Sequence, residues 1–248
     1  MTLFQRNFKL IVTYDGSTFF GFQLQPDCST IQGTLEEIIS SVVGEKVRIL
    51  GAGRTDTGVH ALGQVASFKT NCKIPVEKLV FCLNERLPDS VRVLSVEEVN
   101  KDFHPRFMAK GKHYRYIFRT GKLFSPFLSR YSFQVSRKLD IGKMSSGAEK
   151  FLGEYDFAAF AKSPGKVENS IRKMFASRIE VDGDFVFFDI VGSGFLHNMV
   201  RNMAKALFLI GKGEMKPCVI DELYENQDRT HLGSPAPPGG LYLMKVMY

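Results

Sequence analysis

The chain of 248 residues contains no tryptophan, only four cysteines and no long run of apolar residues. Its longest apolar runs, 79–83 and 206–210, are far shorter than the roughly 20 residues that a membrane-spanning helix requires. Polar residues near the start interrupt any apolar segment of the kind found in secretory signals. We therefore expect no membrane association and a cytoplasmic location.

The cysteines are too scattered to predict a metal site or a disulfide framework, because no two of them form a C-x-x-C pair. They are Cys28, Cys72, Cys82 and Cys218. Several catalytic motifs are missing as well: G-x-S-x-G, H-E-x-x-H, the phosphate-binding P-loop and a strand followed by G-x-G-x-x-G. We therefore expect neither a metal nor a nucleotide cofactor, and any reaction should use a carboxylate, a phenol and arginines.

The composition is that of a packed globular protein, with 44% hydrophobic and 24% charged residues. Its length suits one large domain or two small ones. Lysine and arginine number 33 against 26 acidic residues, which leaves a net charge of +7. This balance suits a partner that carries phosphates. Charge alone is a weak signal, since many basic proteins bind no nucleic acid.

The N-terminal part of the chain predicts the element order βαββαβ. Alternating apolar residues indicate a strand over 8–14. Ser29 and Gln32 form a candidate capping box for a helix that Gly44 ends. The apolar face of this helix comprises Ile31, Leu35, Ile38, Ile39 and Val42. The other expected elements are strands over 47–50, 64–68 and 91–99 and a helix over 76–87.

The C-terminal part predicts the same order. Alternating residues over 112–119 indicate a strand, and Asp140 is a candidate cap for a helix over 141–152. Two strands over 175–181 and 185–191 form a hairpin around Asp182-Gly183, a pair suited to a type I′ turn. A helix over 195–210 then stops at Gly211, and a last strand covers 241–246.

Two successive βαββαβ units predict an α+β protein with two ferredoxin-like, or RRM-like, halves at residues 1–105 and 106–248. Each half would have an antiparallel sheet with helices on one face. If the two sheets meet, their bare faces form a shared cleft of a width suited to RNA. The repeat is one of element order and not of sequence.

A stretch punctuated by glycines, GAGRTDTGVHALGQVASF over 51–68, places a lone carboxylate, Asp56, between two threonines. An aspartate in such a turn is usually structural and caps a neighbouring backbone group. By the same standard, Tyr114 is a packing residue of a strand and Arg201 belongs to the solvated face of a helix. The surrounding motifs decide between these structural roles and catalytic ones.

Five stretches together resemble the tRNA pseudouridine synthase A family. They are the Asp56 loop, YDGSTFFGFQLQ (14–25), KHYRYIF (112–118), FLHNMVRN (195–202) and GLYLMKVMY (240–248). They occur in matching order from residue 8 to the end. The resemblance implies a cofactor-free isomerase that converts uridines 38, 39 and 40 of the tRNA anticodon arm to pseudouridine. It also implies two joined sheets and a homodimer.

The same resemblance implies a role for three residues of the N- and C-terminal halves. Asp56 stands where the family has its nucleophile, Tyr114 where it has the active-site tyrosine, and Arg201 where it has the arginine that pairs with the aspartate. Thr57 stands where the family usually has alanine, and Phe22 where it commonly has tryptophan. Neither departure touches a reacting group, so we expect them to alter loop packing or substrate preference at most.

The chemistry suits these groups. Pseudouridine formation breaks the N1–C1′ bond and rejoins the uracil to the sugar through C5. Water must not react with the sugar in between, so we expect Asp56 in a dry pocket. Burial favours the neutral acid, and the adjacent Arg201 guanidinium favours the ionised form. Tyr114 offers an aromatic face for the base and a hydroxyl for proton transfer at C5. The residues leave open whether Asp56 attacks C1′, attacks C6 or removes the C2′ proton.

Other residues are candidates for binding the RNA. Extrusion of a uridine from a paired stem costs a few kcal/mol, and Arg54 is placed to fill the vacated slot and contact the phosphate. We expect Thr55, His60 and Gln64 to contact the substrate, with the alternative that His60 and Gln64 only brace the turn. Basic residues interleaved with aromatics over 102–115 suit phosphate contacts beside stacked bases, or they form a charged linker. The expected RNA-binding residues are Arg106, Lys110, Lys112 and His197.

A different class of function is a non-catalytic RNA-binding module with two RRM-like halves. Such a module would use the same platform without chemistry. No strand carries the aromatic RNP1 signature of an RRM, whereas an acid, a tyrosine and an arginine occupy the motif positions. The sequence therefore favours the isomerase.

Overall fold

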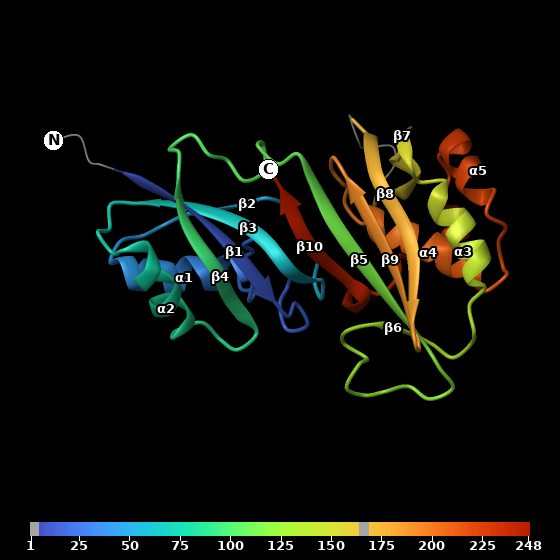
Figure 1. Ribbon diagram of the computed structural model, residues 1–248, viewed down its shortest axis with the longest axis horizontal. Helices are drawn as coiled ribbons and strands as arrows, with labels where there is room; N and C mark the ends of the chain where they lie inside the picture. The colour runs from blue at the N-terminus through green and yellow to red at the C-terminus, as the bar shows by residue number, and fades with distance from the viewer. Residues whose placement is uncertain (1–4, 164–168) are drawn as a thin grey trace. The chain divides into compact units, whose positions relative to one another are not determined.

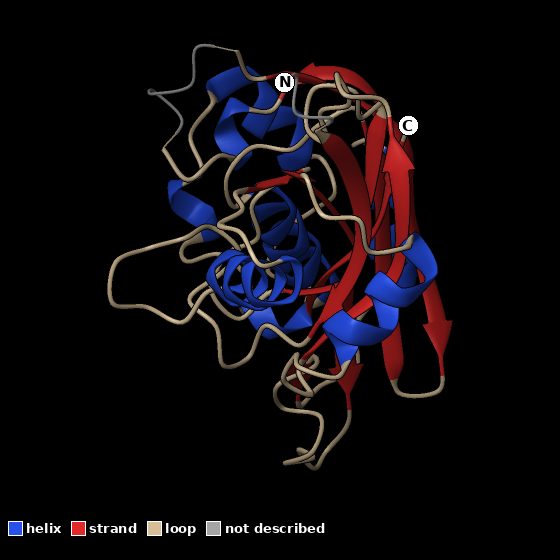
Figure 2. Ribbon diagram, turned by 90° about the vertical axis from the view of Figure 1, so that its left-hand side faces the viewer, coloured by secondary structure: helices blue, strands red, loops and turns tan. Residues whose placement is uncertain are grey.

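The computed structural model describes residues 5–163 and 169–248. The chain groups into two compact units (Figure 1): unit 1 comprises Met1–Lys110 and Leu243–Tyr248, and unit 2 comprises Gly111–Tyr242. Both units contain helices and strands (Figure 2), so the fold is mixed α+β. The grouping assigns the C-terminal residues to the N-terminal unit, and the division into domains at 105/106 stays a prediction.

Unit 1 contains two helices and an antiparallel sheet. Its elements are β1 (Arg6–Tyr14), α1 (Ile31–Val43), β2 (Ile49–Gly51), β3 (His60–Thr70), α2 (Val76–Asn84), β4 (Val91–Val99) and the larger part of β10 (Leu241–Met247). β1 lies between β4 and β3, while β2 and β10 both pair with β3. The alternation expected in the first strand is confirmed, because Phe8, Leu10 and Val12 are fully buried.

The expected capping box of α1 is wrong by one residue. Thr30 is the N-cap, and its Oγ1 accepts a hydrogen bond from the backbone N–H of Gly33 at 3.2 Å. The amide of Gln32 is directed inward instead, where its Oε1 accepts from the backbone N–H of Leu24 at 3.0 Å. The predicted helix end is confirmed, since Gly44 adopts a left-handed φ of 73° that favours glycine.

Unit 2 contains three α-helices and the strands β5 to β9 within the residues that the structure describes. Its elements are β5 (Gly111–Thr120), β6 (Phe133–Val135), α3 (Ile141–Glu149), β7 (Gly153–Asp156), β8 (Ile171–Asp182), β9 (Phe185–Gly192), α4 (Met199–Gly211) and α5 (Val219–Asn226). The strand order is β5-β9-β8-β7 with antiparallel pairs, and β6 pairs in parallel with β5. Large buried aromatics, Tyr116, Phe118, Phe151 and Phe188 among them, fill the core.

Several element ends in unit 2 differ from the prediction. α4 begins at Met199, not at Phe195, because Asn198 has a left-handed φ of 63° that interrupts the helix. The expected stop of α4 is confirmed, since the helix ends at Gly211. Asp182 pairs with Phe185, so the hairpin turn consists of Gly183 and Asp184 and not of Asp182 and Gly183. Only Gly183 of this pair has a positive φ, which excludes a type I′ turn.

Other differences concern helices and strands whose sequences show little hydrophobic periodicity. The Asp140 cap is confirmed, as its side chain accepts from the N–H of Lys143, but α3 stops before Phe151. The expected order βαββαβ does not include the short strands β6 and β7 or the helix α5. Across the described ranges, none of the helices has the length and apolar character needed to cross a membrane.

Candidate active site

Asp56 lies in the connection between β2 and β3, within unit 1. Its backbone carbonyl accepts a hydrogen bond from the N–H of Val59 at 3.1 Å, which closes a tight turn. The side chain of Asp56 is half-buried, while its neighbours Arg54 and Thr57 are exposed. The expectation of a dry pocket around Asp56 stays a prediction.

Thr55, the residue before Asp56, is held at two of its oxygens. Its Oγ1 lies 2.8 Å from the Oη of Tyr14, the last residue of β1. Its backbone carbonyl accepts from the N–H of Phe22 at 3.0 Å. Both partners come from the segment that ends β1 and leads to α1. This segment therefore packs along the Asp56 turn and fixes its backbone.

Two of the expected substrate-binding residues are buried braces of the same turn. His60 is 2% exposed, and its Nδ1 accepts from the N–H of Gly16 at 3.1 Å. Gln64 is fully buried, and its Nε2 donates to the carbonyl of Gly53 at 3.0 Å. Thr55 is 7% exposed. These contacts favour the bracing alternative, and a contact of these residues with RNA stays a prediction.

Two glycines allow the close packing of the β1–α1 segment on the Asp56 turn. A Cβ atom on Gly16 would lie 2.0 Å from the carbonyl oxygen of Val59. Gly21 has a left-handed φ of 85°, and a Cβ there would lie 2.7 Å from the carbonyl oxygen of Thr55. No other residue type fits either position without moving the backbone. The YDGSTFFGF stretch thus has a structural reason for both glycines.

Tyr114 lies on β5 in unit 2, with its side chain turned to the buried face of the sheet. It is 7% exposed, and its ring meets the ring of Phe195 edge-on with centroids 5.0 Å apart. Phe195 belongs to the irregular segment that leads into α4. The expected packing role and an active-site role are therefore both compatible with this placement.

Arg201 lies in the first turn of α4 and is half-buried. Its Nε donates to the carbonyl of Ala236 at 2.8 Å, and its Nη1 donates to the Oδ1 of Asn198 at 3.2 Å. The sequence analysis missed both partners. The Asn before the helix was a usable signal, because asparagine tolerates the left-handed conformation and often ends or starts helices.

The arginine charge acts on a second tyrosine of β5. Burial raises the pKa of Tyr116 well above its usual value, and the nearby Arg201 charge lowers it in part. The Oη of Tyr116 donates to the carbonyl of Pro237 at 2.7 Å. β5 and α4 therefore bring Tyr114 and Arg201 to the same part of unit 2. The combination of these two residues with Asp56 of unit 1 stays a prediction.

The expected RNA-binding residues differ in accessibility. Arg106, Lys110 and His197 are exposed, whereas Lys112 is half-buried. Beside Arg106, the ring of Phe107 is 78% exposed and lies 4.3 Å from the ring of His104. An exposed aromatic ring next to basic groups is suited to stacking on a base.

His113 and Arg115 of β5 form a polar cluster with Asp189 of the neighbouring strand β9. This carboxylate is 2% exposed and is bonded by His113 Nε2 at 2.6 Å and by Arg115 Nη2 at 2.8 Å. Burial alone would raise the pKa of Asp189, but the hydrogen bonds and charges of His113 and Arg115 outweigh it and hold the pKa below its usual value. The cluster is an internal ion pair network.

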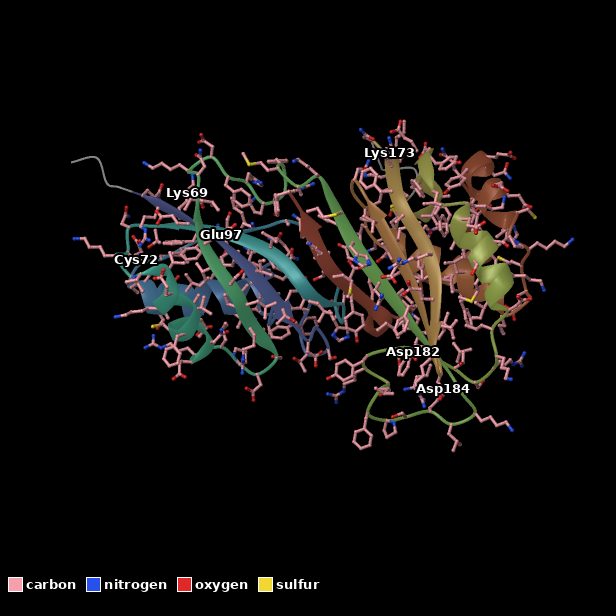
Figure 3. All side chains as sticks on the ribbon, viewed as in Figure 1. Lys69, Cys72, Glu97, Lys173, Asp182 and Asp184 are labelled. Carbon is pink, nitrogen blue, oxygen red and sulfur yellow. The ribbon has the colours of Figure 1, made fainter. Side chains whose placement is uncertain are left out.

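Charge is unevenly placed along the β8–β9 hairpin. Asp182 and Asp184 lie at its turn, and Lys173 lies toward the other end of β8 (Figure 3). The carbonyl of Lys173 accepts from the N–H of Ser193, in the segment that leads to α4.

Comparisons with known proteins agree on one family. The model of that family, described as tRNA pseudouridine synthase, matches residues 10–108 and 148–248. These ranges include Asp56 and Arg201, while Tyr114 lies between them. A protein of Thermoanaerobacter sp. (strain X514) named tRNA pseudouridine synthase A is 42% identical over 243 residues, 98% of this chain and 100% of the relative. One from Geotalea daltonii with the same name is 44% identical with the same coverage.

A solved structure, an archaeal box H/ACA Nop10–Cbf5 complex, matches with a TM-score of 0.36 and 14% identity. The match covers 81% of this chain and 44% of the other. This likeness is too weak to bear on the site.

Proposed function

Since the chain belongs to the tRNA pseudouridine synthase family and is therefore an isomerase that forms pseudouridine in tRNA, we propose that it modifies uridines 38, 39 and 40 of the anticodon arm with Asp56 as nucleophile or base. The main observation in support of this role is the turn around Asp56, in which Asp56 is half-buried and Arg54 and Thr57 are exposed. The proposal includes a cytoplasmic location and a homodimer. Each chain of the dimer would consist of two halves, residues 1–105 and residues 106–248.

The proposed fold has two ferredoxin-like halves that share an RNA-binding cleft. Strand pairing in unit 1 supports this for the first half, because the order β4-β1-β3-β2 combines with one helix after β1 and another after β3. That combination is the split βαβ arrangement. In the second half the corresponding strands are β5, β8 and β9, with α3 and α4 as the helices.

Asp56 carries the central step of the proposed reaction. The N1–C1′ bond breaks, the uracil turns, a C5–C1′ bond forms, the C5 proton leaves and N1 gains a proton, so the atoms of substrate and product balance. A carboxylate can assist by attack at C1′, by attack at C6 or by removal of the C2′ proton. The half-buried position of Asp56 suits all three, because the bound base itself would exclude the remaining water.

Arg201 and Tyr114 complete the proposed site. The Arg201 guanidinium is proposed to pair with Asp56 when the substrate is bound. Its hydrogen bonds to Ala236 and Asn198 fix two of its nitrogens, so the charge would be held in place before the substrate binds. The Tyr114 ring supports the base, and its hydroxyl takes part in moving the C5 proton.

Arg54 is proposed to enter the stem when the uridine leaves it. Its exposed side chain stands two residues before Asp56. A guanidinium there can fill the vacated slot and contact the phosphate. Arg106, Lys110, Lys112 and His197 are proposed to contact the phosphates further along the RNA, where each contact adds to the salt dependence of binding.

The test uses tRNA labelled with tritium at uracil C5, from which each isomerisation releases the label. We expect release by the wild type at positions 38–40, mapped in the product, and a loss of about 1,000-fold or more for Asp56→Asn at unchanged tRNA affinity. Asp182→Asn, at the exposed end of β8, is the matched control. Equal release by Asp56→Asn would reject the role of Asp56, and label lost from other positions would reject the proposed targets.

A further inference from the structure

Tyr14 is a buried residue whose polar group faces the Asp56 turn. It ends β1, pairs with Ala61 of β3 and Val91 of β4, and is 4% exposed. Burial raises the pKa of its phenol to about 12. The hydroxyl therefore keeps its proton at neutral pH and acts as a hydrogen-bonding group only.

The neighbouring Gln64 orders the hydrogen bonds of this phenol. The side-chain Nε2 of Gln64 donates to the carbonyl of Gly53 at 3.0 Å and to the Tyr14 Oη at 3.4 Å. The Tyr14 Oη lies 2.8 Å from the Thr55 Oγ1, and one of these two hydroxyls donates to the other. A chain of hydrogen bonds therefore links Gln64, Tyr14 and Thr55.

The backbone around Asp56 depends on this chain. Thr55 is held at its side chain by Tyr14 and at its carbonyl by the N–H of Phe22. The carbonyl of Asp56 is held by the N–H of Val59. The peptide units on both sides of Asp56 are thus fixed, and the direction in which its side chain leaves the backbone is fixed with them.

The geometry points to Tyr14 as a positioning residue for Asp56, acting through the Thr55 hydroxyl. The inference rests on the proposed role of Asp56 in the reaction. Tyr14 does not touch the substrate in this assignment. Its hydroxyl sets the orientation of the reacting carboxylate, and a displacement of about 1 Å at such a group can lower a rate about 100-fold.

Three variants separate positioning from folding. Tyr14→Phe keeps the ring in the core and removes the hydroxyl, Thr55→Val removes the partner, and Thr55→Ser restores a hydroxyl in the same place. We expect Tyr14→Phe and Thr55→Val to lower the single-turnover rate of tritium release about 10- to 100-fold, with the tRNA Kd unchanged. Thr55→Ser should restore most of the rate that Thr55→Val loses.

The double variant Tyr14→Phe/Thr55→Val provides a coupling test. Because both changes remove the same interaction, the double variant should be no slower than the slower single variant. Rates that multiply would mean that the two residues act separately and would overturn the inference. The same is true if Thr55→Ser is as slow as Thr55→Val.

Tyr224→Phe is the matched control, since it also removes a hydroxyl from a largely buried tyrosine. The Oη of Tyr224 donates to the carbonyl of Lys150 at 3.3 Å, within unit 2. We expect this control to keep the wild-type rate. A wild-type rate for Tyr14→Phe would overturn the inference, and so would a loss that disappears once the rate is corrected for the folded fraction.

Failure of this inference can be told apart from failure of the proposed function. If Asp56→Asn is inactive and Tyr14→Phe is fully active, only the positioning role is wrong. If Asp56→Asn retains the wild-type rate, the role of Asp56 is wrong and the positioning role falls with it.

Discussion

Arg201 and Ala236 hold each other by two hydrogen bonds of opposite direction. The guanidinium Nε donates to the carbonyl of Ala236 at 2.8 Å, and the N–H of Ala236 donates to the carbonyl of Arg201 at 3.2 Å. The next residue, Pro237, accepts a hydrogen bond from the buried Tyr116. A loop rich in proline and glycine is thereby attached both to β5 and to the first turn of α4, and it fixes the arginine.

Replacing Arg201 by lysine tests whether position or charge matters. Arg201→Lys keeps one positive charge but loses the planar set of donors that binds Ala236 and Asn198 together. We expect the rate of tritium release to fall more than about 10-fold, equivalent to about 1.4 kcal/mol, with little change in tRNA affinity. Arg178→Lys, on the exposed side of β8, is the control. An Arg201→Lys enzyme at the wild-type rate would show that charge alone suffices.

The hydroxyl of Tyr114 is tested by Tyr114→Phe. The ring keeps its edge-on contact with Phe195, so folding and tRNA binding should be preserved. If the hydroxyl moves the C5 proton, turnover should fall about 100-fold or more. Tyr155→Phe, at a surface tyrosine, should leave turnover unchanged. Full turnover by Tyr114→Phe would leave the residue with a packing role only.

Gly21→Ala should disturb the Asp56 turn without touching a reacting group. A left-handed φ costs alanine about 1 kcal/mol, and the new Cβ would lie 2.7 Å from the carbonyl of Thr55. We expect a loss of about 2–4 kcal/mol in the free energy of unfolding, measured by urea denaturation, together with a slower reaction.

Gly44→Ala is the control for that change. Gly44 has a similar φ of 73°, but nothing lies within 4 Å of a Cβ there. The strain should then act alone, at about 1 kcal/mol, and the activity of the folded enzyme should be unaffected. Equal losses for the two variants would mean that the contact with Thr55 is unimportant.

The Asp189 cluster should make stability depend on pH. The folded-state pKa of Asp189 lies below its usual value, so its contribution is present above about pH 4, the pKa of an unfolded aspartate. It is lost as the pH falls through the folded-state pKa. Asp189→Asn should lower the free energy of unfolding by about 3 kcal/mol at pH 7 and by progressively less below pH 4.

Urea denaturation at a series of pH values measures this effect, with Asp184→Asn as the control. Asp184 is largely exposed and lies 3.7 Å from Arg119, so its removal should change stability little at any pH. A constant difference between the wild type and Asp189→Asn from pH 7 to pH 3 would contradict the assignment.

Local rules account for the parts of the fold that the sequence analysis predicted correctly. The Asp140 cap, the Gly44 helix end and the alternation in β1 each depend on residues a few positions apart. The start of α4 and the pairing of β10 depend on more. Asn198 takes a conformation that apolar periodicity does not report, and β10 pairs with a strand far away in the chain.

The candidate site divides in the same way. Motif positions point to Asp56, Tyr114 and Arg201, since their chemistry is visible in the residue types. The residues that hold these three side chains in place cannot be identified from the sequence. In the sequence, Tyr14 has the pattern of a buried strand residue, which does not reveal the hydrogen bond of its hydroxyl. Ala236 binds Arg201 through its backbone carbonyl, so its side chain gives no signal.

The place of β10 beside β3 has a consequence for biosynthesis. Unit 1 combines residues before 111 with residues 243–248, so the part of β3 that pairs with β10 stays uncovered until β10 leaves the ribosome. An open strand edge is prone to pair with other nascent chains. Early termination within the last strand should therefore yield aggregated protein rather than a shortened enzyme.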